Sequence, residues 1–479
     1  MKEKSSNIYL IFLNILIIVY SLYICFSIFK NKVLLADDLS KVYELKNISG
    51  SYFKYIHAFL DSYTMASRPI SGFVTGTLMF FSKYNENVYF LGMLFFPLSL
   101  VVIYIVIQKI LSKELASLIT LLYVCSLLGT SIQFSPIMLN SNLATIFFSL
   151  SIFYLYFYEK ILISSLFFIA SVLSYEIFFP LFLLHVFLLK DNKKRILFLV
   201  LTLGTIIVFR KVIQPIVFVH SYQRDDISKI LDFNRVMFVG VCSVKLFFKD
   251  IFVGIYKSLL NFKRLYFLEL GLALLVSSTI YQTFRHYNFR DKLQFLEKIC
   301  MISFISTLVS LSVFVFSSYI PTVFGFDNRN LGAVRLFYTI FVSTGLIYLF
   351  IKIKLRNQTI SIILASIIFI LITTNINIKN SWIYAHNYNN ELFSKLKHAL
   401  KKDHITQGVV CIDNDIFNEL STNSNLIFKE SIFYNNWEGP MLCEMNGLDS
   451  KKIHVYNIEK SMGCSVLFLY KKGLLIRIK

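Results

Sequence analysis

The run Ile8–Phe29, IYLIFLNILIIVYSLYICFSIF, is followed closely by the acidic pair Asp37-Asp38 in KNKVLLADDLSK. An apolar run of about 20 residues crosses the ~30 Å hydrocarbon core of a bilayer as a helix. Lys2 and Lys4 precede the run, which is long and lacks a small-residue cleavage site. We therefore expect it to remain as a membrane helix and not to be removed as a signal peptide.

The remainder of the chain has the same apolar character. Its 479 residues are 56% hydrophobic and 16% aromatic, whereas soluble domains are about 45–50% apolar. We predict an all-α polytopic membrane protein with about eleven transmembrane helices. The predicted spans are 8–29, 88–110, 115–130, 143–158, 161–174, 177–189, 196–219, 265–283, 301–320, 336–351 and 360–374.

The formal net charge of +20 is distributed mainly between the apolar runs. A nucleic-acid-binding protein gathers its Lys and Arg on one soluble face, so this distribution argues against nucleic acid as a partner. Basic clusters occur at 190–195, 285–298 and 352–356. The positive-inside rule places them in the cytoplasm, together with the N-terminus, beside anionic membrane lipids.

Successive spans cross the membrane in opposite directions from a cytoplasmic N-terminus. This alternation predicts that the long loops lie outside. These are the first outer loop, 30–87, and the segments 131–140, 220–264, 321–335 and everything after Asn375. Within the third of them, apolar residues recur at helical spacing with Lys between them in VKLFFKDIFVGIYKSLLNFKRL. This pattern predicts a helix that lies in the membrane interface.

The character of the chain changes after Asn375. The segment 389–402 predicts an amphipathic helix, GVVCID at 408–413 a short buried strand, and the last residues a hairpin that turns at Lys472-Gly473. We therefore predict a transmembrane domain, 1–375, and a small extracytoplasmic α/β domain, 376–479.

The seven cysteines show no CxxC or Cys/His spacing that would build a metal site. We expect no cofactor, and no residue pattern supports a divalent cation. Cys411, Cys443 and Cys464 share the C-terminal region. In an oxidising compartment, two of these three can form a disulfide.

The acidic pair Asp37-Asp38 has two interpretations. Neighbouring carboxylates repel each other, which raises the pKa of one of them, so one can act as a base while the other orients it. Alternatively, ADDLSK starts the following helix, because Asp accepts hydrogen bonds from free backbone N–H groups there.

The wider arrangement resembles a known family. An acidic pair after the first membrane helix is followed by a long outer loop that ends in SRPISG, by the amphipathic stretch FVTGTLMFFSKYNENVYF and by the second membrane helix. This layout resembles the polytopic GT-C glycosyltransferases, in particular the bacterial branch related to O-antigen glucosyltransferases. The segment SYEIFFP is also similar, with Tyr175 where many members have Lys before Glu176.

The resemblance implies an inverting sugar transfer at the outer face of the bacterial cytoplasmic membrane. The donor would be a polyprenyl-phosphate-linked sugar, the acceptor a glycan, lipid or protein, and the catalytic base Asp37 or Asp38. The departing phosphate needs fixed positive charge, which Arg supplies well. The residues expected to bind substrate are Arg68, Tyr175, Glu176, Arg224, Arg329 and Arg335.

Several alternatives stay open. Arg329 and Arg335 can serve as snorkelling residues at a helix end, and the second outer acidic pair, Asp225-Asp226, is explained as solvated loop charge. Arg210 and Glu269 lie inside apolar runs, and we expect them to pair with each other. The rival functions are a transporter or flippase of lipid-linked glycans and an O-antigen polymerase or ligase.

Overall fold

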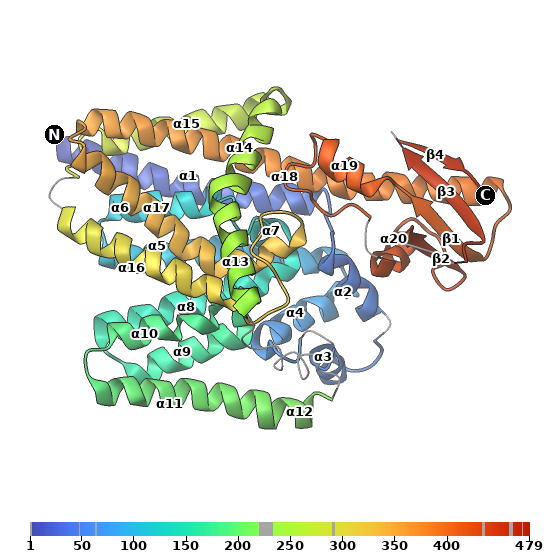
Figure 1. Cartoon of the computed structure of the whole chain (residues 1–479), viewed down its shortest axis with the longest axis horizontal. Helices are drawn as coiled ribbons and strands as arrows, with labels where there is room; N and C mark the ends of the chain where they lie inside the picture. Colours follow the sequence, from blue (N-terminus) through green and yellow to red (C-terminus); the bar gives the residue numbers. More distant parts are fainter. Residues whose placement is uncertain are drawn as a thin grey trace.

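A computed structural model describes residues 2–46, 48–62, 65–219, 233–289, 293–433, 436–458, 463–471 and 473–479, without the side chains of 2–6 and 43–46. A bundle of long helices carries a small sheet domain at one end (Figure 1). The N-terminus lies at the opposite end of the bundle (Figure 1).

Eight helical segments among the described residues are long and apolar enough to cross a membrane. The chain is therefore a multi-pass membrane protein in character. The segments comprise α1 (Lys2–Lys30), η1 (Glu86–Leu94) with α5 (Phe95–Ile110), η2 (Pro136–Met138) with α8 (Leu139–Tyr158), α11 (Asn192–Val208) with η4 (Phe209–Ile213) and α12 (Gln214–Val217), α15 (Phe267–Phe284), α16 (Leu293–Leu311) with η10 (Ser312–Phe314), η11 (Phe326–Leu331) with α17 (Gly332–Lys352), and α18 (Asn357–Lys402).

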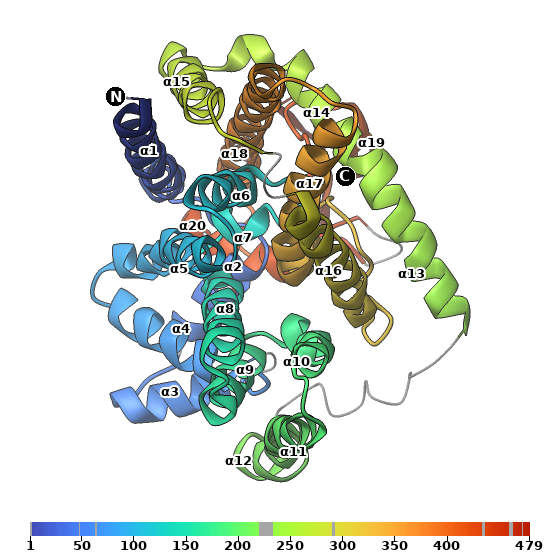
Figure 2. The same cartoon turned by 90° about the vertical axis from the view of Figure 1, so that its left-hand side faces the viewer.

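The three remaining predicted spans are helical but short. They correspond to α6 (Lys113–Cys125), α9 (Ile161–Ser174) and η3 (Glu176–Leu181) with α10 (Phe182–Leu188). Helix α6 lies in the middle of the bundle, between α1, α5, α17 and α18 (Figure 2). Because these helices are shorter than the ~20 residues that a bilayer requires, the count of eleven stays a prediction.

The segment predicted as the first outer loop folds into helices near the sheet domain (Figure 1). They are α2 (Asp37–Lys46), α3 (Tyr52–Leu60) and α4 (Pro69–Ser82). Pro69 stands in the first turn of α4, where its missing N–H costs no hydrogen bond. Arg68 immediately precedes this proline. The start of α4 therefore fixes the backbone position from which the Arg68 side chain extends.

The predicted interfacial helix is helical as expected. Helices α13 (Phe233–Lys245), η7 (Leu246–Asp250) and α14 (Ile251–Leu260) run across the long helices of the bundle (Figure 1). Phe248, Phe252 and Tyr256 are 60–77% exposed along one side, whereas Ile251 and Ser258 are buried. An exposed apolar stripe on a crosswise helix is typical of a helix at a membrane surface.

The C-terminal domain is a four-stranded sheet with order β2-β1-β3-β4. Strand β1 (Gly408–Asp413) pairs in parallel with β2 (Ile453–Asn457) and β3 (Val466–Lys471), and β3 pairs antiparallel with β4 (Leu474–Arg477). The predicted strand and the hairpin pairing are confirmed. The domain also contains α19 (Ile416–Thr422), η12 (Asn436–Glu438) and α20 (Gly439–Met445).

Helix α18 joins the two parts. It runs for 46 residues without a Gly or Pro that would break it. Its second half packs against α20 and β4 of the sheet domain. The predicted domain boundary between 375 and 376 therefore falls inside one continuous helix.

Cys411 of β1 forms a disulfide with Cys464, which precedes β3, while Cys443 is buried and free. The expectation that two of the three C-terminal cysteines pair is met. Disulfides persist in oxidising compartments and are rare in the cytoplasm. The bond therefore favours an extracytoplasmic position for this domain.

We expect the variant Cys411→Ser/Cys464→Ser to lose about 2–4 kcal/mol of stability, because the bond closes a loop with a sequence separation of 53. Thermal unfolding of the purified protein checks this. Dithiothreitol should lower the midpoint of the wild type and leave that of the variant unchanged. Equal midpoints for the oxidised wild type and the variant would contradict the prediction.

A buried ion pair links three long helices. The Nζ of Lys379 in α18 lies 2.8 Å from Oε1 of Glu269 in α15. Both side chains are 3% exposed. Tyr23 of α1 donates to the same carboxylate at 2.7 Å. The expected pairing of Glu269 with Arg210 is therefore wrong, because Lys379 is the closer cation; Arg210 instead interacts electrostatically with Glu176.

Candidate active site

Asp37 and Asp38 form the first turn of α2, where the positive end of the helix dipole favours carboxylates. The preceding residue, Ala36, has φ of 49°, a left-handed conformation that redirects the chain from α1 into α2. The helix-start interpretation is thus correct for the backbone. The two side chains, however, point into different surroundings.

Asp38 is 1% exposed and is held by three donors. Its carboxylate accepts hydrogen bonds from Tyr89 Oη and Ser135 Oγ at 2.6 Å each, and from the backbone N–H of Ile137 at 3.0 Å. Burial raises the pKa of Asp38 to about 7, although these hydrogen bonds act in the opposite direction. Asp38 therefore ties α2 to η1 and η2.

This burial predicts a pH-dependent stability. An unfolded Asp has a pKa of about 3.9, so the folded state binds the proton of Asp38 more tightly than the unfolded state does. The contribution of Asp38 to the free energy of unfolding therefore falls as the pH rises through 7. We expect the unfolding midpoint of the wild type, relative to Asp38→Asn, to decrease between pH 5 and pH 8. A pH-independent difference for Asp38→Asn would contradict the prediction.

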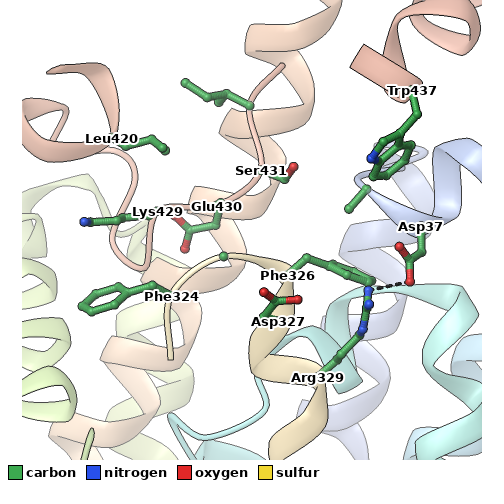
Figure 3. A pocket seen from close by; sticks show the side chains of 13 residues that line it. Asp37, Phe324, Phe326, Asp327, Arg329, Leu420, Lys429, Glu430, Ser431 and Trp437 are labelled. Atoms are coloured by element: carbon green, nitrogen blue, oxygen red, sulfur yellow. Dashed lines mark hydrogen bonds and ion pairs between the residues drawn. The ribbon is translucent and has the colours of Figure 1, made fainter. Parts of the chain in front are cut away.

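Asp37 borders a cavity of about 400 Å³ where the bundle meets the C-terminal domain (Figure 3). This volume is within the ~300–1,000 Å³ range of small-molecule sites. The walls come from the start of α2, from the loop that leads into η11, and from the C-terminal domain. The lining residues are Ala36, Asp37, Phe324, Gly325, Phe326, Asp327, Arg329, Leu420, Lys429, Glu430, Ser431, Ile432 and Trp437.

Arg329 forms an ion pair with Asp37, with 2.5 Å between Nη1 and Oδ2. The Arg329 guanidinium also stacks over the ring of Phe326 at 4.7 Å. Asp37 is 37% exposed, whereas Arg329 is 14% exposed. The pair therefore presents a solvent-accessible carboxylate, oriented by a largely buried cation.

The loop that leads into η11, together with η11 itself, which carries Arg329, is fixed from both sides. The N–H of Gly325 donates to the carbonyl of Phe428 at 2.8 Å, and Gly325 adopts φ of 65°. Asn328 accepts hydrogen bonds from the N–H and the hydroxyl of Ser131. The first contact joins the loop to the C-terminal domain, and the second joins it to the bundle.

The C-terminal domain contributes charge to the cavity. The Nζ of Lys429 lies 5.2 Å from the ring centre of Phe324. Glu430 is 2% exposed, and burial raises its pKa to about 7. Sequence reasoning missed these residues and Trp437, because no motif marks them and they lie about 400 positions from Asp37 in the chain.

A second polar cluster adjoins the cavity. Arg68 donates two hydrogen bonds to the Glu176 carboxylate. The distance is 2.8 Å from Nε to Oε2 and 2.6 Å from Nη2 to Oε1. Its guanidinium stacks over the ring of Tyr175 at 4.4 Å. The hydroxyl of Tyr175 donates to Asn330 Oδ1 at 2.6 Å, next to Arg329 in the chain. These three predicted residues come together, yet they do not line the cavity.

Arg335 lies apart from both groups. It is fully buried and donates to the carbonyls of Tyr123 and Gly129 and to the side chain of Gln133. These bonds satisfy carbonyls at and beyond the end of α6, and Arg335, which was expected to bind substrate, does not line the cavity. Arg224 and the rival acidic pair of the same loop lie outside the described residues.

No group of three or more His, Cys, Asp or Glu side chains is placed to hold a metal ion within the described ranges. The chemistry available in the cavity is that of a hydrated carboxylate, of arginine and lysine cations, and of aromatic walls. Such a site can accept a proton and stabilise an anion. No family model matches the chain, and neither a curated protein nor a solved structure matches it.

Proposed function

We propose that this protein is a membrane glycosyltransferase of GT-C type. It transfers a sugar from a polyprenyl-phosphate carrier to an acceptor at the outer face of the bacterial cytoplasmic membrane. The observation that carries the proposal is the pair of Asp37 and Arg329 in a cavity at the end of a bundle of membrane helices.

The reaction assigns separate tasks to the two residues. The Asp37 carboxylate removes the proton from an acceptor hydroxyl, and the oxygen attacks the anomeric carbon of the donor sugar. The bond from that carbon to the phosphate oxygen breaks, and polyprenyl phosphate leaves with the electron pair. Arg329 holds Asp37 in place and stabilises the negative charge that grows on the phosphate.

Phosphate is a sufficiently good leaving group that the reaction needs no proton donor for it. Attack from the side opposite the phosphate inverts the configuration at the anomeric carbon. Arg68, with Glu176 and Tyr175, lies beside this site and supports it through Asn330. We assign these three residues to positioning the donor end of the site.

Two observations support the proposed sidedness. The N-terminus lies at the end of the bundle opposite the cavity (Figure 1), and the basic clusters of the sequence favour a cytoplasmic N-terminus. The disulfide between Cys411 and Cys464 favours an oxidising compartment for the domain that covers the cavity.

The experiment that tests the function compares cells with and without the chain. Surface glycans and lipids are isolated from both and analysed by mass spectrometry, together with the polyprenyl-phosphate sugars of the membrane. We expect cells without the chain to lack one sugar residue on a surface molecule and to accumulate the donor. Restoring the wild-type chain should reverse both changes.

Unchanged surface glycans would overturn the proposal. Accumulation of a complete lipid-linked glycan at the cytoplasmic face, with no single sugar missing, would instead identify a flippase. Loss of whole glycan repeats would identify a polymerase or ligase.

A further inference from the structure

Trp437 is unusually exposed for a tryptophan, a residue type that is mostly buried in folded proteins. The chain has two tryptophans. Trp382 is 3% exposed and packs against Phe134 and Phe326. Trp437, in contrast, is 45% exposed and lines the cavity. Its indole thus offers a large apolar surface to whatever occupies the cavity.

The residues on both sides of Trp437 are held by hydrogen bonds to their side chains. Asn436 accepts a hydrogen bond from the N–H of Asn457 at 2.9 Å. Glu438 is fully buried and accepts one from the hydroxyl of Ser431 at 3.2 Å. These contacts hold η12, the short helix that carries Trp437, at the edge of the cavity.

The helix η12 lies close to the helix that begins with Asp37. Helix α2, which begins with Asp37, packs against both η12 and α20. Figure 3 shows the indole above the Asp37 carboxylate, with the Arg329 guanidinium beyond it. A flat ligand on the indole would therefore have a carboxylate and a guanidinium at its edge.

A pyranose ring matches this arrangement. One face of the ring is made of C–H groups and can bury its apolar area on an indole. Its hydroxyls can donate to the Asp37 carboxylate and accept from Arg329. A lipid tail would exclude water from the charged groups of this cavity without offering them a hydrogen bond in return, which is costly.

We infer that the acceptor is a glycan, and that its acceptor sugar stacks on Trp437 with one hydroxyl at Asp37. This inference rests on the proposed function and narrows the acceptor class from glycan, lipid or protein to glycan. The C-terminal domain then supplies the acceptor-binding surface of a site whose base comes from the bundle.

The first test uses the acceptor identified by the cell-surface comparison and measures kinetics on purified full-length protein in nanodiscs. We expect Trp437→Ala to raise the acceptor KM by about tenfold or more, with the donor KM unchanged. Trp437→Phe should restore most of the loss. Leu474→Ala, an exposed apolar residue of β4 in the same domain, serves as the control. An unchanged acceptor KM in Trp437→Ala would overturn the inference.

The second test does not depend on activity. Tryptophan fluorescence of the wild type is titrated with methyl α-D-glucopyranoside, methyl α-D-mannopyranoside and N-acetyl-D-glucosamine, and Trp437→Phe serves as the control. A response in the wild type that the variant lacks supports the sugar site even if no transfer is found, in which case the proposed function alone fails. If no transfer is found and the titrations are flat, both fail.

Discussion

Replacing Asp37 with Asn is expected to reduce the rate of sugar transfer by about 10²–10⁴-fold, the usual effect of removing a general base. Asn has the same shape and can still accept a hydrogen bond from Arg329, but it cannot take the proton of an acceptor hydroxyl. The expected signature is therefore a loss of kcat with little change in either KM. Initial rates with purified protein in nanodiscs measure it.

Two further variants make this prediction specific. Glu86→Gln changes a carboxylate that is 71% exposed and paired with Lys32 outside the cavity, and it should leave the rate unchanged. Asp38→Asn should alter stability more than rate, because Asp38 is enclosed by Tyr89 and Ser135. If Asp38→Asn abolished transfer in a folded protein while Asp37→Asn did not, the assignment of the base would be wrong.

The variant Lys379→Met is expected to cost about 3–5 kcal/mol of stability, because it leaves the Glu269 carboxylate charged and unpaired in a buried position. Both side chains are 3% exposed, so water cannot take the place of the missing ammonium group. Tyr23 would still donate one hydrogen bond to Glu269, which limits the loss. Denaturant unfolding of the detergent-solubilised protein measures the change.

The double variant Lys379→Met/Glu269→Gln should recover most of this loss, since it removes the unpaired charge as well. Lys402→Met, at the exposed end of the same helix, should change stability by less than about 0.5 kcal/mol. Additive losses in the double variant would indicate that the two side chains do not act as a pair.

Much of the fold follows from the sequence, because membrane helices are set by the length of apolar runs. The eight long helical segments overlap eight of the predicted runs. The short runs around α6, α9 and α10 are harder to assign from sequence, since their length fits neither a full membrane span nor a surface helix. The break expected after Asn375 reflected a change in composition, whereas the backbone of α18 contains no residue that would end a helix there.

The site was predictable in part. Asp37 and Arg329 were both expected to act, but they are 292 positions apart, and only the folded chain brings their side chains together. The sequence could not separate Asp37 from Asp38, because their different surroundings depend on how α2 sits against η1 and η2. Trp437 lies in a region without a motif, so local sequence carried no signal for it.

The length of helix α18 sets how far the C-terminal domain lies from the membrane-spanning part of the chain. As an α-helix its 46 residues extend for about 69 Å, more than twice the ~30 Å of a hydrocarbon core. One continuous helix thus reaches from the apolar span to the C-terminal domain, where it packs against α20 and β4.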